Sequence, residues 1–248
     1  MSPRVILITL GFVPNKVFKH TAARLEQSLS GKHAIDCIFV AKPYPIDLEN
    51  NLRMNKADAI ESGYRVIERS VDSGAAGDFN QTIRELDLQD DDIVINYDSD
   101  TYAIHDGWDD AMIRALRGDP QLDWICLWNE ATGAEFSIKS AGKAVIDGIN
   151  IEYAAEWMMV GVSGFRGRFL KATGGLIQPP KYYGGVEAAM WEAIVERGTR
   201  QAFLSDFGED QRIKHANEDE RYRNWKTVAC QKAFHFSFET WLKINESI

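Results

Sequence analysis

The sequence predicts an α/β fold in which a doubly wound, mainly parallel sheet is flanked by helices. Short apolar runs rich in β-branched residues recur along the first half of the chain, as in strands that are buried on both faces of a sheet. Segments with helical periodicity separate these runs, and this alternation is typical of right-handed βαβ units. With 248 residues, 45% of them hydrophobic, the chain can bury a substantial core.

The first half of the chain carries the clearest elements. The stripe Phe18, Ala22, Leu25 indicates a helix, and Ser30-Gly31 ends it. The expected elements are strands at Val5–Leu10, Ile35–Val40, Tyr64–Ile67, Trp124–Trp128 and the run that begins at Ile93, with helices at Lys16–Leu29, Asp78–Leu86 and Gly107–Leu116.

The second half is less regular. Thr132–Asn150 is rich in Gly, Ala and Ser, and its order is left open. The pattern Val186, Ala189, Met190, Ala193, Ile194 predicts an amphipathic helix. The other expected elements are a strand at Trp157–Val162, a short helix at Phe165–Thr173, a strand at Gln201–Leu204 and a partly helical tail. We expect one domain over residues 1–248, with halves at about 1–101 and 102–217 and a tail at 218–248.

Composition narrows the possible partners. The formal net charge is −9, which disfavours general affinity for nucleic acid or for an anionic membrane. Cys37, Cys126 and Cys230 have no metal-like spacing, so they predict reduced core thiols and a cytoplasmic protein. The apolar run at the N-terminus is too short to span a membrane, and we expect no membrane span.

The most informative stretch is Ile93-Val-Ile-Asn-Tyr-Asp98-Ser-Asp100-Thr101. On extended backbone, Asp98 and Asp100 point to the same side. Open α/β sheets bind their ligands at the carboxyl ends of the strands. Two adjacent carboxylates therefore predict a hard divalent ion shared with a diphosphate, whereas a solvated acidic turn is the alternative.

The ordered motifs resemble the GT-A (Rossmann-like) glycosyltransferases, especially the family-2-like enzymes that use nucleotide sugars. The motifs are Thr9-Leu-Gly11 at a strand end, Ser73-Gly-Ala-Ala-Gly-Asp-Phe-Asn80, Asp98-Ser99-Asp100, and Gly184-Gly185-Val-Glu187 at a helix start. A strand and His215 follow them. The resemblance covers roughly Val5 to His215, which is most of the chain.

The resemblance implies a role for each motif. Asp98 and Asp100 would hold Mn²⁺ or Mg²⁺ on the diphosphate of a nucleoside-diphosphate sugar, with His215 as a further ligand and His105 as its competitor. Glu187 would be the catalytic base, which fits inversion. Contacts to the nucleotide sugar are expected from Thr9, Gly11, Arg69, Asn80, Asp98, Ser99, Gly184 and Gly185.

The sequence also allows two other classes of protein. A non-catalytic module that binds sugar nucleotides or glycans could share the fold, and so could a nucleotidyltransferase, although no Gly-rich basic loop lies near the N-terminus.

Glu130 and Asp206 are alternative bases, and Trp128 is expected on the acceptor side. The acceptor could be a glycan, a protein, a small molecule or a hydroxylated base in phage-type modified DNA. A basic-aromatic cluster in the tail, with Arg212, Lys214, Arg221, Tyr222, Arg223, Trp225 and Lys226, could contact an anionic acceptor.

Overall fold

The computed structural model describes residues 3–11, 13–41, 49–71, 73–103, 105–127, 139–158, 161–178, 185–205 and 213–215, together with 220, 221, 224 and 228. In chain order the elements are β1 (Val5–Leu10), α1 (Asn15–Ser28), β2 (Ile35–Ala41), α2 (Glu49–Glu61), β3 (Arg65–Glu68), α3 (Gly74–Glu85), β4 (Ile93–Tyr97), β5 (Thr101–Ala103), α4 (Trp108–Gly118), β6 (Leu122–Cys126), β7 (Ser140–Ile146), β8 (Ile149–Ala154), β9 (Val162–Arg166), α5 (Gly167–Thr173), α6 (Val186–Glu196), β10 (Arg200–Leu204) and β11 (Ile213–His215).

One mixed, mostly parallel sheet organises the described chain. Its nine strands run in the order β3-β2-β1-β4-β9-β6-β10-β8-β7. The strands β3, β2, β1 and β4 are parallel to one another, and β6 is parallel to β10. β9 lies between β4 and β6 and is antiparallel to both, so β4, β6 and β10 point the same way. The predicted fold class is confirmed.

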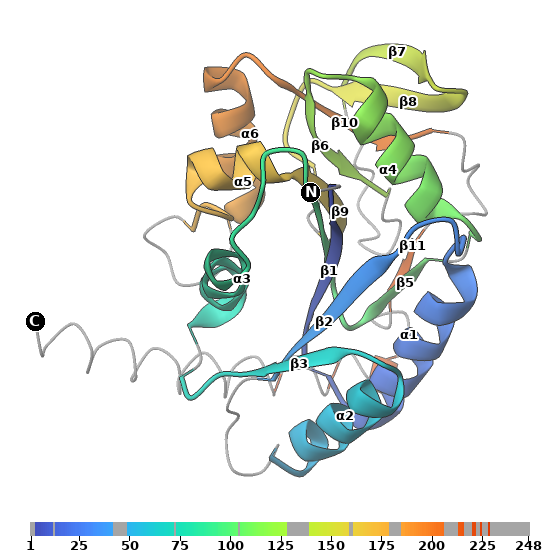
Figure 1. The fold of residues 1–248 in the computed structure, drawn as a ribbon, viewed down its shortest axis with the longest axis vertical. Helices are drawn as coiled ribbons and strands as arrows, with labels where there is room; N and C mark the ends of the chain where they lie inside the picture. The colour runs from blue at the N-terminus through green and yellow to red at the C-terminus, as the bar shows by residue number, and fades with distance from the viewer. Residues whose placement is uncertain are drawn as a thin grey trace, which may run out of the picture.

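Helices cover both faces of this sheet (Figure 1). On one face, α3, α5 and α6 pack on alternate strand residues through Phe79, Phe169 and Met190. On the other face, α1 and α4 pack through Leu25 and Met112, and α2 lies beside α1. Residues alternate between the faces because successive side chains on a strand point to opposite sides. Burial on both faces explains why the strands are continuous apolar runs.

Two expectations in the second half were wrong. The strand expected at Trp157–Val162 begins only at Val162, as β9. The helix expected at Phe165–Thr173 begins at Gly167, because Phe165 and Arg166 still belong to that strand. β9 is a fully buried strand that contains polar residues. Ser163 accepts a hydrogen bond of 3.0 Å from the Trp124 indole, which satisfies its hydroxyl inside the sheet.

Other features were missed or misplaced, among them the short strands β5 and β11, which were not predicted. The helix expected at Asp78–Leu86 begins earlier, at Gly74. The helix α2 was not predicted, because its sequence alternates polar and apolar residues without a clear stripe. The strand β7 and its turn into β8 lie in the stretch whose order was left open, and β8 continues beyond it to Ala154. Its two-residue turn, Asp147-Gly148, has positive φ at both positions, 50° and 77°, as in a type I′ turn.

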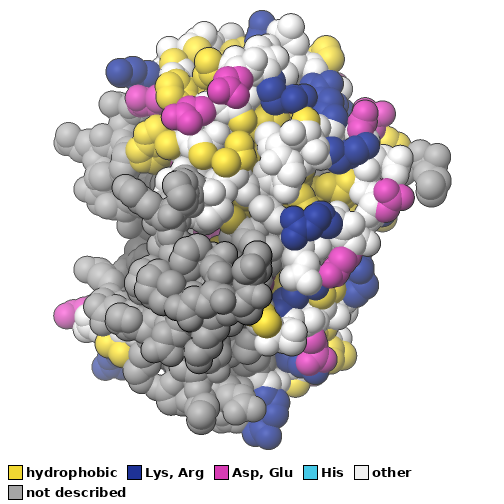
Figure 2. All heavy atoms as spheres, turned by 90° about the vertical axis from the view of Figure 1, so that its left-hand side faces the viewer, with side chains coloured by type: hydrophobic (Ala, Val, Ile, Leu, Met, Phe, Trp, Pro, Cys, Tyr) yellow, Lys and Arg dark blue, Asp and Glu magenta, His cyan; other side chains and the backbone are white. Residues whose placement is uncertain are grey.

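The surface on the side of α3, α5 and α6 is mixed in charge. Lys and Arg side chains are interspersed there with Asp, Glu and hydrophobic side chains (Figure 2). In the tail, the four described residues have helical backbone. Within the described chain, no helix is long and apolar enough to cross a membrane.

Candidate active site

The candidate site begins where β4 ends. All five residues of β4 are buried. β1 pairs with it in parallel on one side and β9 pairs antiparallel on the other. Because both edges of the strand are paired and both faces are covered, the residues that follow Tyr97 are held in a fixed position.

The segment Asp98–Thr101 forms a tight turn. The Asp98 amide donates to the carbonyl oxygen of Gly161 at 2.8 Å, which ties the turn to the start of β9. The Asp98 carbonyl accepts two hydrogen bonds from Thr101, 3.0 Å from its amide and 2.8 Å from its hydroxyl. The expected extended backbone between the two aspartates was therefore wrong, because Ser99 and Asp100 lie in a turn.

The turn is enclosed by the protein. Ser99 is 7% exposed, Asp100 is 6% exposed and Thr101 is fully buried. Asp98 is half-buried. A fully solvated acidic turn would leave both carboxylates in water, and the burial of Asp100 disfavours that alternative. A buried carboxylate needs a cation or hydrogen-bond donors.

Two neighbours hold the Asp98 carboxylate. The Asn96 side-chain amide donates to Asp98 Oδ1 at 3.1 Å. A Cβ at Gly161 would lie 3.4 Å from Asp98 Oδ2, which is ordinary van der Waals contact, so the carboxylate rests against the backbone there. The Asn96 amide is neutral, so this hydrogen bond positions the Asp98 carboxylate without neutralising its charge. That Asp98 ligates a metal ion stays a prediction.

Helix α1 supports the middle of the turn. The hydroxyl of Thr21, which is 2% exposed, lies 2.9 Å from the carbonyl oxygen of Ser99 and donates to it. Ser99 stands between the two aspartates, so this contact fixes the peptide that sets their separation. Neither Thr21 nor Gly161 was expected from the sequence, and no local motif marks them.

A late strand returns to the same turn. β11 lies beside β5 (Figure 1) and pairs antiparallel with it, and in this register His215 lies opposite Thr101. The backbone of His215 is therefore next to Asp100, although its side chain lies outside the described residues. His105, the competing ligand, follows β5 on the way to α4.

The donor set suits a hard divalent cation. Carboxylate oxygens are the ligands that Mg²⁺ and Mn²⁺ take in proteins. In the described ranges no group of three or more His, Cys, Asp or Glu side chains is arranged to hold a metal. Two aspartates fit a metal ion whose other ligands are a histidine, a diphosphate or water. Which residues ligate the ion remains a prediction.

Thr9 and Gly11 lie at the end of β1, beside β4. Thr9 is 2% exposed and stands opposite Phe39 in the register of β2. The Gly11 amide donates to the Val40 carbonyl at 3.1 Å. A Cβ at Gly11 would lie 2.2 Å from the tip of the Phe39 ring, so this glycine is required by close packing. Contact with a nucleotide stays a prediction for both residues.

Arg69 and Asn80 have structural partners. The Arg69 guanidinium pairs with Glu85 at 2.7 Å and donates to the Thr82 hydroxyl at 2.8 Å, which ties the end of β3 to α3. Asn80 lies inside α3, and its side chain exchanges two hydrogen bonds with the backbone of Leu176, at 2.8 and 2.7 Å. These contacts account for the Asn80 amide and for the two terminal nitrogens of Arg69, whereas Arg69 Nε is buried and has no hydrogen-bond partner among the described residues.

Glu187 lies in the first turn of α6 and is half-buried. The residue before this helix, Gly185, has φ of 83°, a conformation that favours glycine. The end of α6 leads directly into β10, which begins at the edge opposite to Asp98. An eleven-residue helix spans about 16 Å, so its first turn lies toward the edge that carries the Asp98–Thr101 turn. Gly184, the Trp128–Glu130 segment and Asp206 lie outside the described residues.

Comparison with known proteins identifies the fold through structure alone. No family model matches the sequence, and no curated protein matches it. Solved structures do match. A mannosyltransferase from Pyrobaculum calidifontis, in complex with GDP-Man and Mn²⁺, is 14% identical with a TM-score of 0.54, over 98% of this chain and 65% of its own.

Two further solved structures have the same fold. GalNAc-T7, with UDP, GalNAc and Mn²⁺, is 9% identical with a TM-score of 0.63, over 86% of this chain and 44% of its own. Glucosyl-3-phosphoglycerate synthase from Mycobacterium tuberculosis, with Mn²⁺, UDP and phosphoglyceric acid, is 14% identical with a TM-score of 0.52, over 79% of this chain and 65% of its own. The protein therefore has the fold of the GT-A glycosyltransferases. It spans less than two thirds of each of these three chains.

Proposed function

We propose that the protein is a metal-dependent glycosyltransferase that moves a sugar from a nucleoside-diphosphate sugar to an acceptor hydroxyl. The observation that carries the proposal is the enclosed turn Asp98–Thr101 at the end of β4. The fold supports it, because three proteins that share this fold are glycosyltransferases whose structures contain Mn²⁺ and a nucleotide or nucleotide sugar.

The proposed chemistry is a single displacement with inversion. The acceptor oxygen attacks the anomeric carbon, the bond from that carbon to the diphosphate oxygen breaks, and the electron pair leaves with the diphosphate. Glu187, in the first turn of α6, takes the proton of the acceptor hydroxyl. Asp98 and Asp100 would hold Mn²⁺ or Mg²⁺, which supplies Lewis-acid stabilisation of the departing diphosphate.

Donor binding is tested first, by thermal shift of the full chain with a panel of UDP- and GDP-sugars, with and without Mn²⁺. A ligand at about 100 times its Kd stabilises the folded state by about 2.7 kcal/mol. We expect stabilisation by the nucleotide sugar to require the metal. Hydrolysis of the nucleotide sugar without an acceptor then separates a transferase from a module that only binds.

The matched variants are Asp100→Asn and Asp91→Asn. Asp91 is exposed and precedes the same strand, so its variant controls for the loss of one negative charge. We expect Asp100→Asn to lose both metal-dependent stabilisation and turnover, while Asp91→Asn keeps both. Full, still metal-dependent activity in the Asp100→Asn protein would contradict the metal assignment.

The acceptor is identified by offering four classes of molecule in competition: a glycan, a protein, a small molecule and DNA with a hydroxylated base. A DNA acceptor would be held partly through its phosphates, and activity would then fall steeply as salt is raised. The net charge of −9 leads us to expect no such salt dependence. Measurable binding to modified DNA at low salt would favour the DNA class instead.

A further inference from the structure

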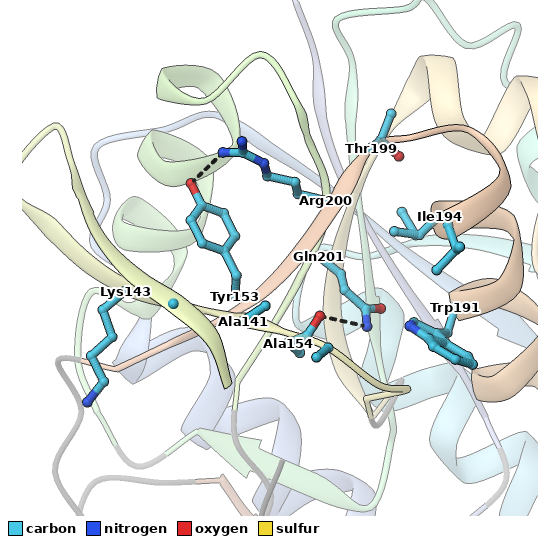
Figure 3. A pocket seen from close by; sticks show the side chains of 12 residues that line it. Ala141, Lys143, Tyr153, Ala154, Trp191, Ile194, Thr199, Arg200 and Gln201 are labelled. Atoms are coloured by element: carbon cyan, nitrogen blue, oxygen red, sulfur yellow. Dashed lines mark hydrogen bonds between the residues drawn. The ribbon is translucent and has the colours of Figure 1, made fainter. Parts of the chain in front are cut away.

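A pocket lies at the amino-terminal end of β10, whereas the Asp98–Thr101 turn lies at the carboxyl-terminal end of β4, which points the same way. Its volume is about 420 Å³, and its walls come from β7, β8, the end of α6 and the start of β10 (Figure 3). β10 begins beside the start of β6. Three strand spacings and about four residues of strand rise separate this point from the turn, roughly 20 Å in all. The pocket is therefore separate from the proposed donor site.

The floor of the pocket holds a buried hydrogen-bond acceptor. Gln201 is 2% exposed and lines the pocket. Its side-chain amide nitrogen donates to the carbonyls of Ala154 and Glu156, which fixes the orientation of the amide group. Its Oε1 is buried and has no hydrogen-bond partner among the described residues. A buried acceptor of this kind is satisfied by a ligand that brings a donor.

A second buried polar group belongs to the same pocket, at some distance from Gln201 in Figure 3. The hydroxyl oxygen of Thr199 is buried and likewise has no hydrogen-bond partner in the part of the chain that the structure describes. Thr199 also lines the pocket. A hydroxyl can donate and accept, and a carboxamide oxygen accepts. The two groups together suit a ligand that carries several hydroxyls.

Aromatic side chains flank these polar groups. Trp191, half-buried on α6, stands on one side of Gln201 in Figure 3, and Tyr153 stands on the other. The Arg200 guanidinium lies over the Tyr153 ring, 5.1 Å from its centre. An indole face packs well against the C–H face of a pyranose ring, and pockets of this size with a few fixed polar groups are typical of small-ligand sites.

The charges around the pocket disfavour an anion. Arg200 has Asp119 at 3.8 Å, and Lys143 has Glu152 at 3.5 Å. Lys143 also extends away from the other side chains of the pocket (Figure 3). Each cation thus has a carboxylate partner. In addition, an anion brings only acceptors, which cannot satisfy the Gln201 oxygen.

We propose that this pocket binds a neutral saccharide, with its ring on Trp191 and its hydroxyls on Gln201 and Thr199. Such a site would hold a sugar chain at a distance from the reaction centre. The inference does not use any residue of the donor site, so it stands or falls independently of the proposed transfer reaction.

The experiment titrates the full chain, without metal and without nucleotide, with methyl glycosides of glucose, galactose, mannose and N-acetylglucosamine, followed by saturation-transfer NMR. We expect weak, saturable binding of at least one glycoside. Trp191→Ala should weaken it roughly tenfold, whereas Glu192→Ala, an exposed neighbour on the same helix, should leave it unchanged.

Thr199→Val is the second variant, because it keeps the shape and removes only the hydroxyl. We expect it to weaken binding by at least threefold without changing the thermal midpoint, since this hydroxyl bonds no other described residue. Absence of glycoside binding up to roughly 100 mM, binding that Trp191→Ala does not change, or binding of sulfate in place of the glycosides would each overturn the proposal.

Discussion

The tether between Thr21 and Ser99 makes a prediction that links the fold to the proposed metal site. In Thr21→Val, the side chain keeps its shape but no longer donates to the Ser99 carbonyl, 2.9 Å away. The hydroxyl also approaches the carbonyls of Val17 and Phe18, but these can accept amide hydrogens within α1. Ser99 is therefore the acceptor that loses most.

The expected cost follows from burial. Leaving a buried carbonyl without its donor costs about 1–3 kcal/mol, which for a chain of this length lowers Tm by about 2–12 °C. Because Ser99 lies between Asp98 and Asp100, loosening it should also raise the Kd for Mn²⁺ by about tenfold or more, as outer-shell changes at metal sites do. Thermal unfolding and Mn²⁺ titration calorimetry measure the two effects separately.

A matched control exists on α5. The Thr173 hydroxyl makes the same kind of contacts, to carbonyls of its own helix and to the Gly175 carbonyl at 2.7 Å. Thr173→Val should lower stability and leave Mn²⁺ affinity unchanged. If Thr21→Val loses stability but binds Mn²⁺ like the wild type, the tether does not position the aspartates, and the reasoning is refuted.

Three further predictions concern other parts of the structure. Burial by itself raises the pKa of Asp92, but hydrogen bonds from Arg4 and Gln89 lower it below its ordinary value of 3.8. The ionised Asp92 carboxylate therefore stabilises the folded state fully above that pH, and this stabilisation is lost as the pH falls below it. Urea midpoints should fall more steeply below about pH 4 in the wild type than in Asp92→Asn. Gly11→Ala should cost about 1–3 kcal/mol in urea unfolding, because its Cβ would overlap the Phe39 ring. Glu187→Gln should lower turnover by about 10² to 10⁴ with donor affinity unchanged, and near wild-type turnover would remove Glu187 as the base.

The strands that sequence predicted well are those with uninterrupted apolar runs. β1 was predicted with its observed bounds, and Ile93 was correctly placed as the first residue of β4. Burial on both faces requires such runs, so their composition identifies them. The hairpin turn Asp147-Gly148 also carried a sequence signal, which the Gly- and Ser-rich composition around it obscured.

β9 shows why other strands were misplaced. Its residues include a serine, a glycine and an arginine, all buried. Arg166 is tolerated there because it donates to the carbonyls of Leu122 and Asp119, at 2.8 and 3.0 Å. Gly164 is required because a Cβ would meet Met112 of α4 at 2.6 Å. These reasons lie in elements far away along the chain, so no local pattern could reveal them.

The candidate site likewise has a part that the sequence determines and a part that only the fold decides. By itself, the sequence determined that two carboxylates, Asp98 and Asp100, follow a buried strand, because residue type and strand composition are local properties. Only the tertiary structure decided that these residues form an enclosed turn. Its supports, Thr21, Gly161 and the strand that carries His215, come from distant parts of the chain. Packing between elements creates that enclosure, and packing is a property of the whole fold.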